Sequence, residues 1–253
     1  MTEAVRLPPA YHLITLEEID STNAEARRQA EEGAPEGTLI RADRQTAGRG
    51  RRGREWRSPG GNLYMSLLLR PNQPLEQSAR LSFVAAVALS DALATLVPPM
   101  IEISLKWPND LLVHGRKCAG LLLESAARAN GILDWLIIGV GVNLISHPDD
   151  LPYPATDLAF EGVTDIKPEA VMEAFARYFL RWSDTWLDRG FEPVRAAWLD
   201  RAHGLGGPLE VRLDRETFSG SFVGLDPDGA LVVGLDDGGQ RRVAAGDVFP
   251  LVT

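Results

Sequence analysis

The residues best suited to chemistry in this sequence are four arginines that alternate with glycines. Residues 48–54 have the sequence GRGRRGR, and residues 46–56 carry four Arg and one Glu, a local charge of +3 in a chain whose net charge is -9. Arginine presents a planar fork of donors that matches a phosphate or a carboxylate. Glycine lets the backbone approach a ligand closely. The segment therefore predicts capture of a small anionic ligand.

The surroundings of this segment favour an ordered loop over a disordered basic tail. Arg/Gly tails lie in low-complexity sequence, and an isolated run of this kind is most often a solvated surface turn. Here Trp56 follows almost at once, and residues 62–69 place four apolar side chains on one face with the period of a β-strand. The acidic net charge also disfavours a nucleic-acid partner, whose phosphates require a broad basic surface.

Three other short motifs carry polar side chains that could serve a site. They are Ser21-Thr22-Asn23, KWPND at residues 106–110 and RKCAG at residues 116–120. Each has a structural explanation when taken alone: a helix N-cap, packing at a strand end and a hairpin with an exposed lysine. The glycines of the apolar segment 135–145 mark places where another group approaches closely, more often for packing than for a ligand.

Composition limits the class of protein. With 253 residues, 45% hydrophobic and 24% charged, the chain fits one large domain or a large and a small one. Its one cysteine, Cys118, excludes an internal disulfide, and its start resembles no signal peptide, so we expect a cytoplasmic protein. The apolar segment 81–97 is too short for a membrane span and predicts a buried helix. The four histidines show no metal-ligand spacing.

The helices and strands that must position these motifs can be predicted from the spacing of apolar residues and from turn residues. We predict helices at 22–32, 81–97 and 168–189, strands at 38–40, 62–69, 101–106 and 135–145, and a hairpin formed by 111–113 and 120–124. The glycine-rich segment 204–208 predicts a linker. Five short strands with Asp-Gly turns follow it, which predicts a small β-barrel.

The four motifs, in this order, resemble those of the biotin–protein ligases, and the similarity covers nearly the whole chain. The resemblance implies an α+β fold: a mixed central sheet with flanking helices, like that of class II aminoacyl-tRNA synthetases, at residues 1–205, and an SH3-like β-barrel at 206–253. Longer members begin with a helix-turn-helix domain. The short segment before Ser21 predicts the ligase-only type, without a DNA partner.

The resemblance also implies a reaction and its partners. Biotin would react with ATP to give biotinyl-5′-AMP, and a lysine of a biotin carboxyl carrier domain, part of a biotin-dependent carboxylase, would then take the biotinyl group. Mg²⁺ is expected with ATP. A membrane partner is not expected, and pairing of two copies through their central sheets is left open.

Site residues follow from the matching motif positions. The residues implied to bind biotin are Ser21, Thr22, Asn23, Gln45, Gly48, Arg49, Arg51, Lys117 and Gly120. The residues implied to bind ATP are Arg51, Arg52, Arg54, Trp56, Asn109, Lys117 and Asn143. Lys117, Arg51 and Asp110 are the expected catalytic residues: Lys117 would stabilise transition-state charge, and Asp110 would assist either a metal ion or the incoming lysine. The metal ligands are not predicted.

Other functions remain as alternatives. A lipoate or octanoyl transferase has a related fold but lacks the GRGRRGR and KWPND segments. A biotin-binding regulator requires a DNA-binding part, and a catalytically inactive binding protein would not need Arg51 and Lys117. Biotin-dependent exchange of pyrophosphate into ATP distinguishes these possibilities.

Overall fold

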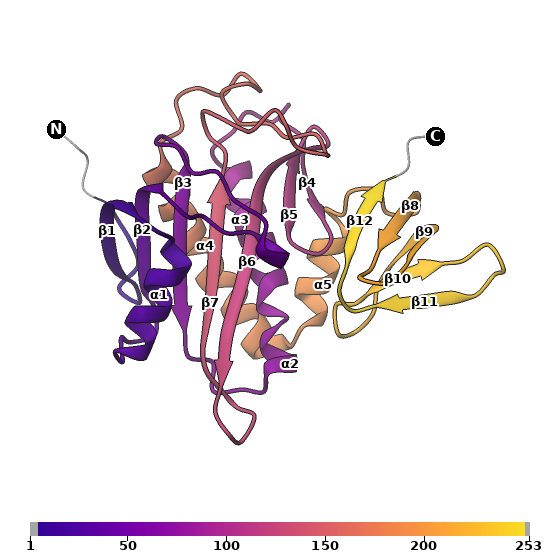
Figure 1. Cartoon of the computed structure of the whole chain (residues 1–253), viewed down its shortest axis with the longest axis horizontal. Helices are drawn as coiled ribbons and strands as arrows, with labels where there is room; N and C mark the ends of the chain where they lie inside the picture. Colours follow the sequence, from indigo (N-terminus) through magenta and orange to yellow (C-terminus); the bar gives the residue numbers. More distant parts are fainter. Residues whose placement is uncertain (1–4, 251–253) are drawn as a thin grey trace.

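A computed structural model describes residues 5–250 as a mixed seven-stranded sheet flanked by helices, with a separate five-stranded antiparallel sheet at the C-terminal end (Figure 1). The strands of the large sheet are β1 (His12–Ile19), β2 (Thr38–Gln45), β3 (Leu63–Leu69), β4 (Ile103–Lys106), β5 (Asp110–Val113), β6 (Arg116–Ala127) and β7 (Leu133–Val142). The helices are α1 (Thr22–Glu31), α2 (Leu75–Ser78), α3 (Leu81–Ala94), α4 (Pro168–Arg189) and α5 (Glu192–Leu199). The predicted α+β class is confirmed.

Helices cover the large sheet, whose strand order is β1-β2-β3-β7-β6-β5-β4, on both faces. Helix α1 packs on β2, β3 and β7 from one side, while α3 and α4 pack on the other (Figure 1). Every residue of β3 is therefore buried, not only the face that its alternation predicts. Only β1 and β2 run parallel, because α1 crosses between them.

Local capping explains where α1 begins and ends. The Ser21 hydroxyl accepts a hydrogen bond from the Ala24 amide (3.5 Å), and Gly33 takes a φ of +88° just beyond the helix end. Arg70 donates to the carbonyls of Ala30 and Ala34, both at 2.9 Å, and so binds the helix C-terminus. The predicted helix and its two ends are confirmed.

The C-terminal strands form the predicted small antiparallel β-domain, and within residues 5–250 their sheet does not close into a barrel. It consists of β8 (Pro208–Arg212), β9 (Thr217–Leu225), β10 (Leu231–Gly234), β11 (Gln240–Val243) and β12 (Asp247–Pro250), in the order β11-β10-β9-β8-β12. A closed barrel requires its first and last strands to pair. Within residues 5–250, β11 pairs with β10 and β12 pairs with β8, so these two short strands form opposite edges.

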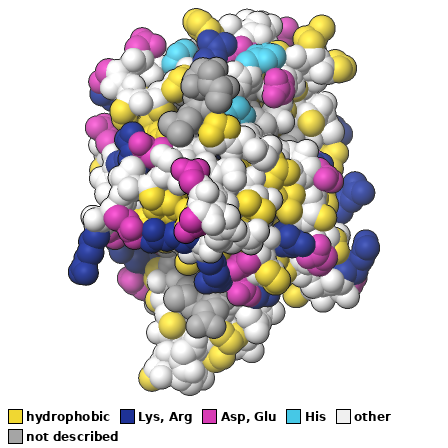
Figure 2. Space-filling view, turned by 90° about the vertical axis from the view of Figure 1, so that its right-hand side faces the viewer, with side chains coloured by type: hydrophobic (Ala, Val, Ile, Leu, Met, Phe, Trp, Pro, Cys, Tyr) yellow, Lys and Arg dark blue, Asp and Glu magenta, His cyan; other side chains and the backbone are white. Residues whose placement is uncertain are grey.

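The C-terminal sheet shares its core with the rest of the molecule. Its inner residues Leu209, Val211 and Phe222 belong to the same hydrophobic cluster as α3 and α5. On the face seen in Figure 2, basic and acidic side chains are interspersed. The C-terminal part of the chain also contains the ion pairs Arg212–Glu210 and Arg241–Glu216. In the described part of the chain, no helix is both long and apolar enough to cross a membrane.

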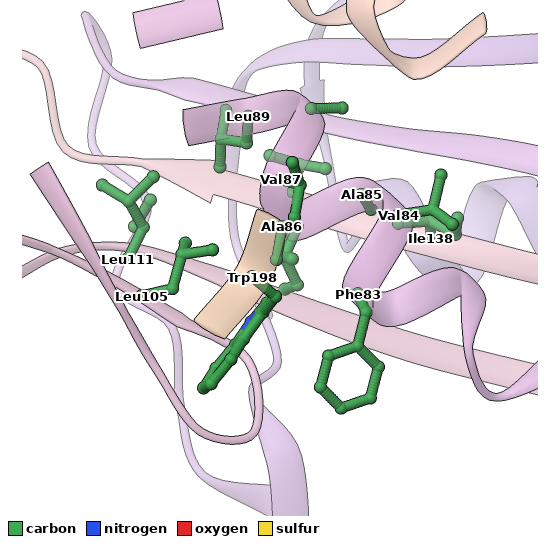
Figure 3. Packing of buried hydrophobic residues seen from close by; sticks show 14 of the residues in the cluster. Phe83, Val84, Ala85, Ala86, Val87, Leu89, Leu105, Leu111, Ile138 and Trp198 are labelled. Atoms are coloured by element: carbon green, nitrogen blue, oxygen red, sulfur yellow. The ribbon is translucent and has the colours of Figure 1, made fainter. Parts of the chain in front are cut away.

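Trp198 of α5 is the largest fully buried side chain, and it connects the two sheets. It makes edge-to-face contacts with Phe83 of α3 (5.7 Å between ring centres) and Phe222 of β9 (6.4 Å), and Figure 3 shows it beside the α3 side chains. The sequence analysis did not predict α5. Its eight residues carry only a short apolar pattern after the Gly190 break.

We predict that Trp198→Ala lowers the free energy of unfolding by about 3–5 kcal/mol, because it leaves a cavity where three elements meet. Urea unfolding measures this loss. The matched control is Leu187→Ala on α4, whose side chain is 65% exposed, and it should change stability by less than about 0.5 kcal/mol. Similar losses for both variants would contradict this account of the core.

Candidate active site

One pocket collects the four sequence motifs. It encloses about 880 Å³ that opens to solvent, and it lies between the N-terminus of α1, the ends of β6 and β7, the arginine loop (residues 48–54) and the start of β12. The lining residues predicted from sequence are Ser21, Thr22, Asn23, Gln45, Arg49, Arg51, Arg54, Trp56, Asn109, Asp110, Lys117 and Gly120. Segments as far apart as residues 21 and 247 therefore meet at one place.

Side-chain hydrogen bonds form the polar end of the pocket. The Gln45 Oε1 atom accepts from the Thr22 amide (2.8 Å) and the Thr22 hydroxyl (3.1 Å). The Gln45 Nε2 atom donates to the Ser58 hydroxyl at 2.9 Å, which orients the amide group. The Ser66 hydroxyl lies 2.8 Å from the Thr22 hydroxyl and continues the network into the sheet. Fixed donors and acceptors of this kind suit a small polar ring with both N–H and C=O groups.

Asn23 continues this network to a carboxylate that the sequence analysis missed. Its Nδ2 atom donates to Glu124 Oε2 (2.7 Å), and its Oδ1 atom accepts from the Ser66 hydroxyl (2.6 Å). A Cβ atom at Gly139 would lie 2.2 Å from Asn23 Oδ1, so this glycine makes the room that Asn23 occupies. The close approach predicted at Gly139 is thus made by a side chain of the protein itself.

Trp56 lies on a pair of glycines that face each other across β6 and β7. Gly120 and Gly141 are register partners, and a Cβ at Gly141 would lie 2.6 Å from the indole ring, one at Gly120 3.1 Å. The Lys117 Nζ atom lies 5.5 Å from the ring centre of Trp56. The Trp56 Nε1 atom is buried without a hydrogen-bond partner among residues 5–250. The Trp56 ring therefore forms one wall of the pocket, and its indole N–H is a donor without a partner in the described residues.

Trp56 also borders another hollow. Asn143, Tyr153 and the proline-containing segment 148–155 line it together with Arg54 and Lys117. The Asn143 Nδ2 atom donates to the Thr156 carbonyl at 3.1 Å. The structure thus places Asn143 beside Trp56 but outside the main pocket.

Three arginines of the arginine loop bind Asn109 or residues around the start of β12. Arg51 donates to Asn109 Oδ1 (3.3 Å) and to the Gly246 carbonyl (3.5 Å), and burial lowers its pKa. Arg54 donates to Asp247 Oδ1 at 2.8 Å. Arg52 takes a φ of +57° and pairs with Asp247 and Asp214. It does not belong to the lining of the main pocket, and its implied binding of ATP stays a prediction.

Two further loop residues take different positions. Arg49 lines the pocket, and its Nη1 atom lies 4.0 Å from Glu124 Oε1. Gly48 does not line the pocket: a Cβ there would lie 2.3 Å from the Trp56 carbonyl oxygen, so this glycine lets the loop fold back on itself. Gly48 thus shapes the loop, and its implied contact with biotin stays a prediction.

Lys117 and Lys106 lie on either side of Asp110. A two-residue turn with positive φ at His114 and Gly115 joins β5 to β6 and places Lys117 opposite β5. The Lys117 Nζ atom is 2.6 Å from Asp110 Oδ1, and the Lys106 Nζ atom is 3.9 Å from Asp110 Oδ2. Burial lowers the pKa of Lys106, against the opposing effect of Asp110. Lys106 is a pocket cation to which the sequence analysis gave no role.

The charges of the pocket define what it can do. It is lined by five cations, Arg49, Arg51, Arg54, Lys106 and Lys117, and by three carboxylates, Glu55, Asp110 and Asp247. This excess of positive charge in a partly enclosed space stabilises an anion, above all one whose charge grows during reaction. The polar network at the other end adds recognition of a neutral group. Among residues 5–250, the pocket lining contains no His or Cys, and burial raises the pKa of the Cys118 thiol.

Comparison with known proteins agrees with this geometry. Residues 54–200 match the biotin/lipoate A/B protein ligase family, and residues 204–249 match the biotin protein ligase C-terminal domain. A biotin–[acetyl-CoA-carboxylase] ligase of Paracoccus denitrificans is 41% identical over 91% of this chain and 97% of its own length.

Two solved structures have the same fold. A biotin protein ligase from Aquifex aeolicus in complex with biotin and ATP is 29% identical, has a TM-score of 0.80, and is matched over 95% of this chain and 99% of that one. A biotin protein ligase from Leishmania major in complex with biotinyl-5-AMP is 26% identical with a TM-score of 0.64, over 94% of this chain and 100% of that one. Sequence, fold and pocket together place this chain in the biotin/lipoate A/B protein ligase family.

Proposed function

We propose that this protein attaches biotin to a lysine of a carrier domain, using ATP and forming biotinyl-5′-AMP on the way. The observation that carries the proposal is the two-ended pocket: a fixed polar network at the end of α1 and a cluster of cations around Lys117. The P. denitrificans relative and the two ligase structures support the same reaction. It is an ATP-dependent ligase reaction.

The polar end suits the ring of biotin. The ureido group of biotin carries one C=O and two N–H groups, and the Thr22–Gln45–Ser58 network offers both donors and acceptors at the bottom of the pocket. Asn23 is fixed by Glu124 and Ser66, so it can present its side chain without reorganisation. Gly120 leaves space along the wall that Trp56 completes.

The cationic end suits the reacting groups. Two anions, the biotin carboxylate and the α-phosphate of ATP, must approach each other, and their repulsion must be neutralised. Lys117 and Arg51 both line this part of the pocket, while Arg49 and Arg54 lie on either side of Arg51 in the loop. Trp56 and Asn143 would contact the base of the nucleotide, since they border the adjoining hollow.

A divalent cation such as Mg²⁺ would accompany ATP, held chiefly by phosphate oxygens, as is usual for this ion. Residues 5–250 contain no group of three or more His, Cys, Asp or Glu arranged to hold a metal ion. The pocket does contain Asp110, and one or two carboxylates suffice for a phosphate-bound Mg²⁺. The residues present therefore fit this ion, which would neutralise phosphate charge, and Asp110 would be its protein ligand.

The acceptor would be a lysine on a biotin carboxyl carrier domain of a carboxylase. Its amine would attack the anhydride carbonyl of biotinyl-5′-AMP and release AMP. The pocket opens to solvent, so a lysine side chain can enter it. An ATP-dependent reaction and the single buried free thiol of Cys118 both fit a cytoplasmic location.

Pyrophosphate exchange tests the proposed reaction directly. Labelled pyrophosphate should enter ATP only when biotin is present, since adenylation of biotin is the reversible first step. Lipoate and octanoate serve as matched controls for the related transferases and should give no exchange. Exchange with lipoate but not with biotin would replace the proposed substrate.

We predict that Lys117→Ala slows adenylation by roughly 100- to 1,000-fold, because one preorganised cation is lost from the transition state. Single-turnover formation of biotinyl-5′-AMP measures the rate, and calorimetry should show biotin bound with nearly unchanged affinity. The control Lys167→Ala removes an exposed lysine at the α4 N-cap and should leave the rate unchanged. A near-normal rate for Lys117→Ala would remove this residue from the mechanism.

We predict that two alanine substitutions on β7 each impair the binding of a different substrate. Gly141→Ala should displace Trp56 and raise the KM for ATP, while Gly139→Ala should displace Asn23 and weaken biotin binding. Both change a glycine of the same strand to the same residue, so each serves as the control for the other. Steady-state kinetics with each substrate varied in turn measures the effects. Equal effects of both variants on both substrates would contradict the assignment of the two ends.

A further inference from the structure

Asp247 joins the C-terminal sheet to the arginine loop. It is the first residue of β12, almost 200 residues from the loop in sequence. Its Oδ1 atom accepts a hydrogen bond from Arg54 Nη2 at 2.8 Å, and its Oδ2 atom lies 3.5 Å from Arg52 Nη1. The carbonyl of the preceding Gly246 accepts from Arg51 at 3.5 Å. Asp247 and the residue just before β12 thus contact three of the four loop arginines.

The Asp247 carboxylate is built into the pocket. Its side chain is 23% exposed and lies among the lining residues. Burial by itself would raise the pKa of Asp247, but the hydrogen bond from Arg54 and the charges of Arg54, Arg51 and Arg52 outweigh burial and lower it. Asp247 is therefore ionised at neutral pH and presents a permanent negative charge to the loop.

The loop requires such a charge to keep its shape. Four arginines within six residues repel one another, and Arg52 adopts a φ of +57°, which is unfavourable for a residue with a side chain. The negative charge of Asp247 offsets the repulsion between the arginines and occupies few of their N–H donors. Arg54 donates from Nη2 to Asp247 and from Nε to the Arg51 carbonyl (3.4 Å). Within residues 5–250 its Nη1 atom makes no hydrogen bond, so the guanidinium can still bind a phosphate.

We propose that Asp247 is a positioning residue for the nucleotide, which acts through Arg54 and Arg52 to hold the arginine loop in the shape that receives the phosphates of ATP. This inference rests on the proposed function and extends it by giving the C-terminal sheet a defined part in nucleotide binding. No role was predicted for Asp247 from the sequence.

The C-terminal sheet does not depend on Asp247 for its attachment. Trp107 Nε1 donates to the Gly229 carbonyl (3.2 Å), Arg80 pairs with Asp228 (2.6 Å), and Arg195 donates to the Leu225 carbonyl (2.8 Å). The shared hydrophobic core adds to these contacts. Removing one charge at position 247 should therefore change the loop while leaving the sheet in place.

The test compares Asp247→Asn with wild type. The KM for ATP in biotin-dependent pyrophosphate exchange should rise about tenfold, while kcat and the biotin Kd stay within about twofold, because the change affects positioning of one substrate. Asp247→Glu keeps the charge and should recover most of the loss. In an Arg54→Ala background, Asp247→Asn should add little, since the two residues act as one unit.

Asp214→Asn is the matched control. Asp214 also pairs with Arg52, but its side chain is 82% exposed and lies outside the pocket, so this variant should leave the KM for ATP within about twofold. An equal rise for both variants would mean that any loop charge suffices, which overturns a specific role for Asp247.

Three other outcomes overturn the inference. An unchanged KM for ATP removes the role, a lowered KM shows that the carboxylate competes with the phosphates, and a joint loss of thermal stability and biotin binding shows a purely structural residue. Absence of exchange in wild type contradicts the proposed function instead. Calorimetric binding of a non-hydrolysable ATP analogue to wild type and Asp247→Asn then still tests the role of Asp247.

Discussion

The mutual repulsion of five cations in one pocket is the constraint on which the rest of the site depends. Like charges a few ångströms apart repel strongly where water is partly excluded. The chain balances them with carboxylates from distant elements: Asp110 lies between Lys106 and Lys117, Glu124 lies near Arg49, and Asp247 binds Arg54. These pairs keep the cations in place, and the remaining positive excess is available to an anionic ligand.

The shape of the pocket depends on glycines in the central strands. The central strands β6 and β7 carry glycines at the positions where two side chains of the site pack closely on the sheet. Trp56 lies on Gly120 and Gly141, and Asn23 lies on Gly139. Any side chain at these positions would move a wall of the pocket. The edge strand β12 of the C-terminal sheet forms another wall of the pocket. Because this sheet shares its hydrophobic core with α3 and α5, β12 is held at a fixed place beside the arginine loop.

Much of the fold could be predicted from the sequence. The α4 helix, the capped α1 helix, the β3 strand and the β5–β6 hairpin follow from apolar periodicity and from turn residues, which are properties of neighbouring positions. The edge strand β1 and the short helix α5 were not predicted, because their apolar patterns are weak by themselves. The open form of the C-terminal sheet depends on which strands pair, and strand pairing leaves no local pattern.

For the site, the sequence by itself determined the reactive groups: the arginine loop, the KWPND and RKCAG motifs, the Ser21–Asn23 cap and the glycines of β7. Only the tertiary structure decided their arrangement. It placed Arg52 outside the lining of the main pocket and Asn143 in the adjoining hollow, and it brought in Lys106, Glu124 and Asp247. The physical reason is that side-chain charge and hydrogen bonding act through space, so partners as distant in sequence as Arg54 and Asp247 meet only once both sheets have packed.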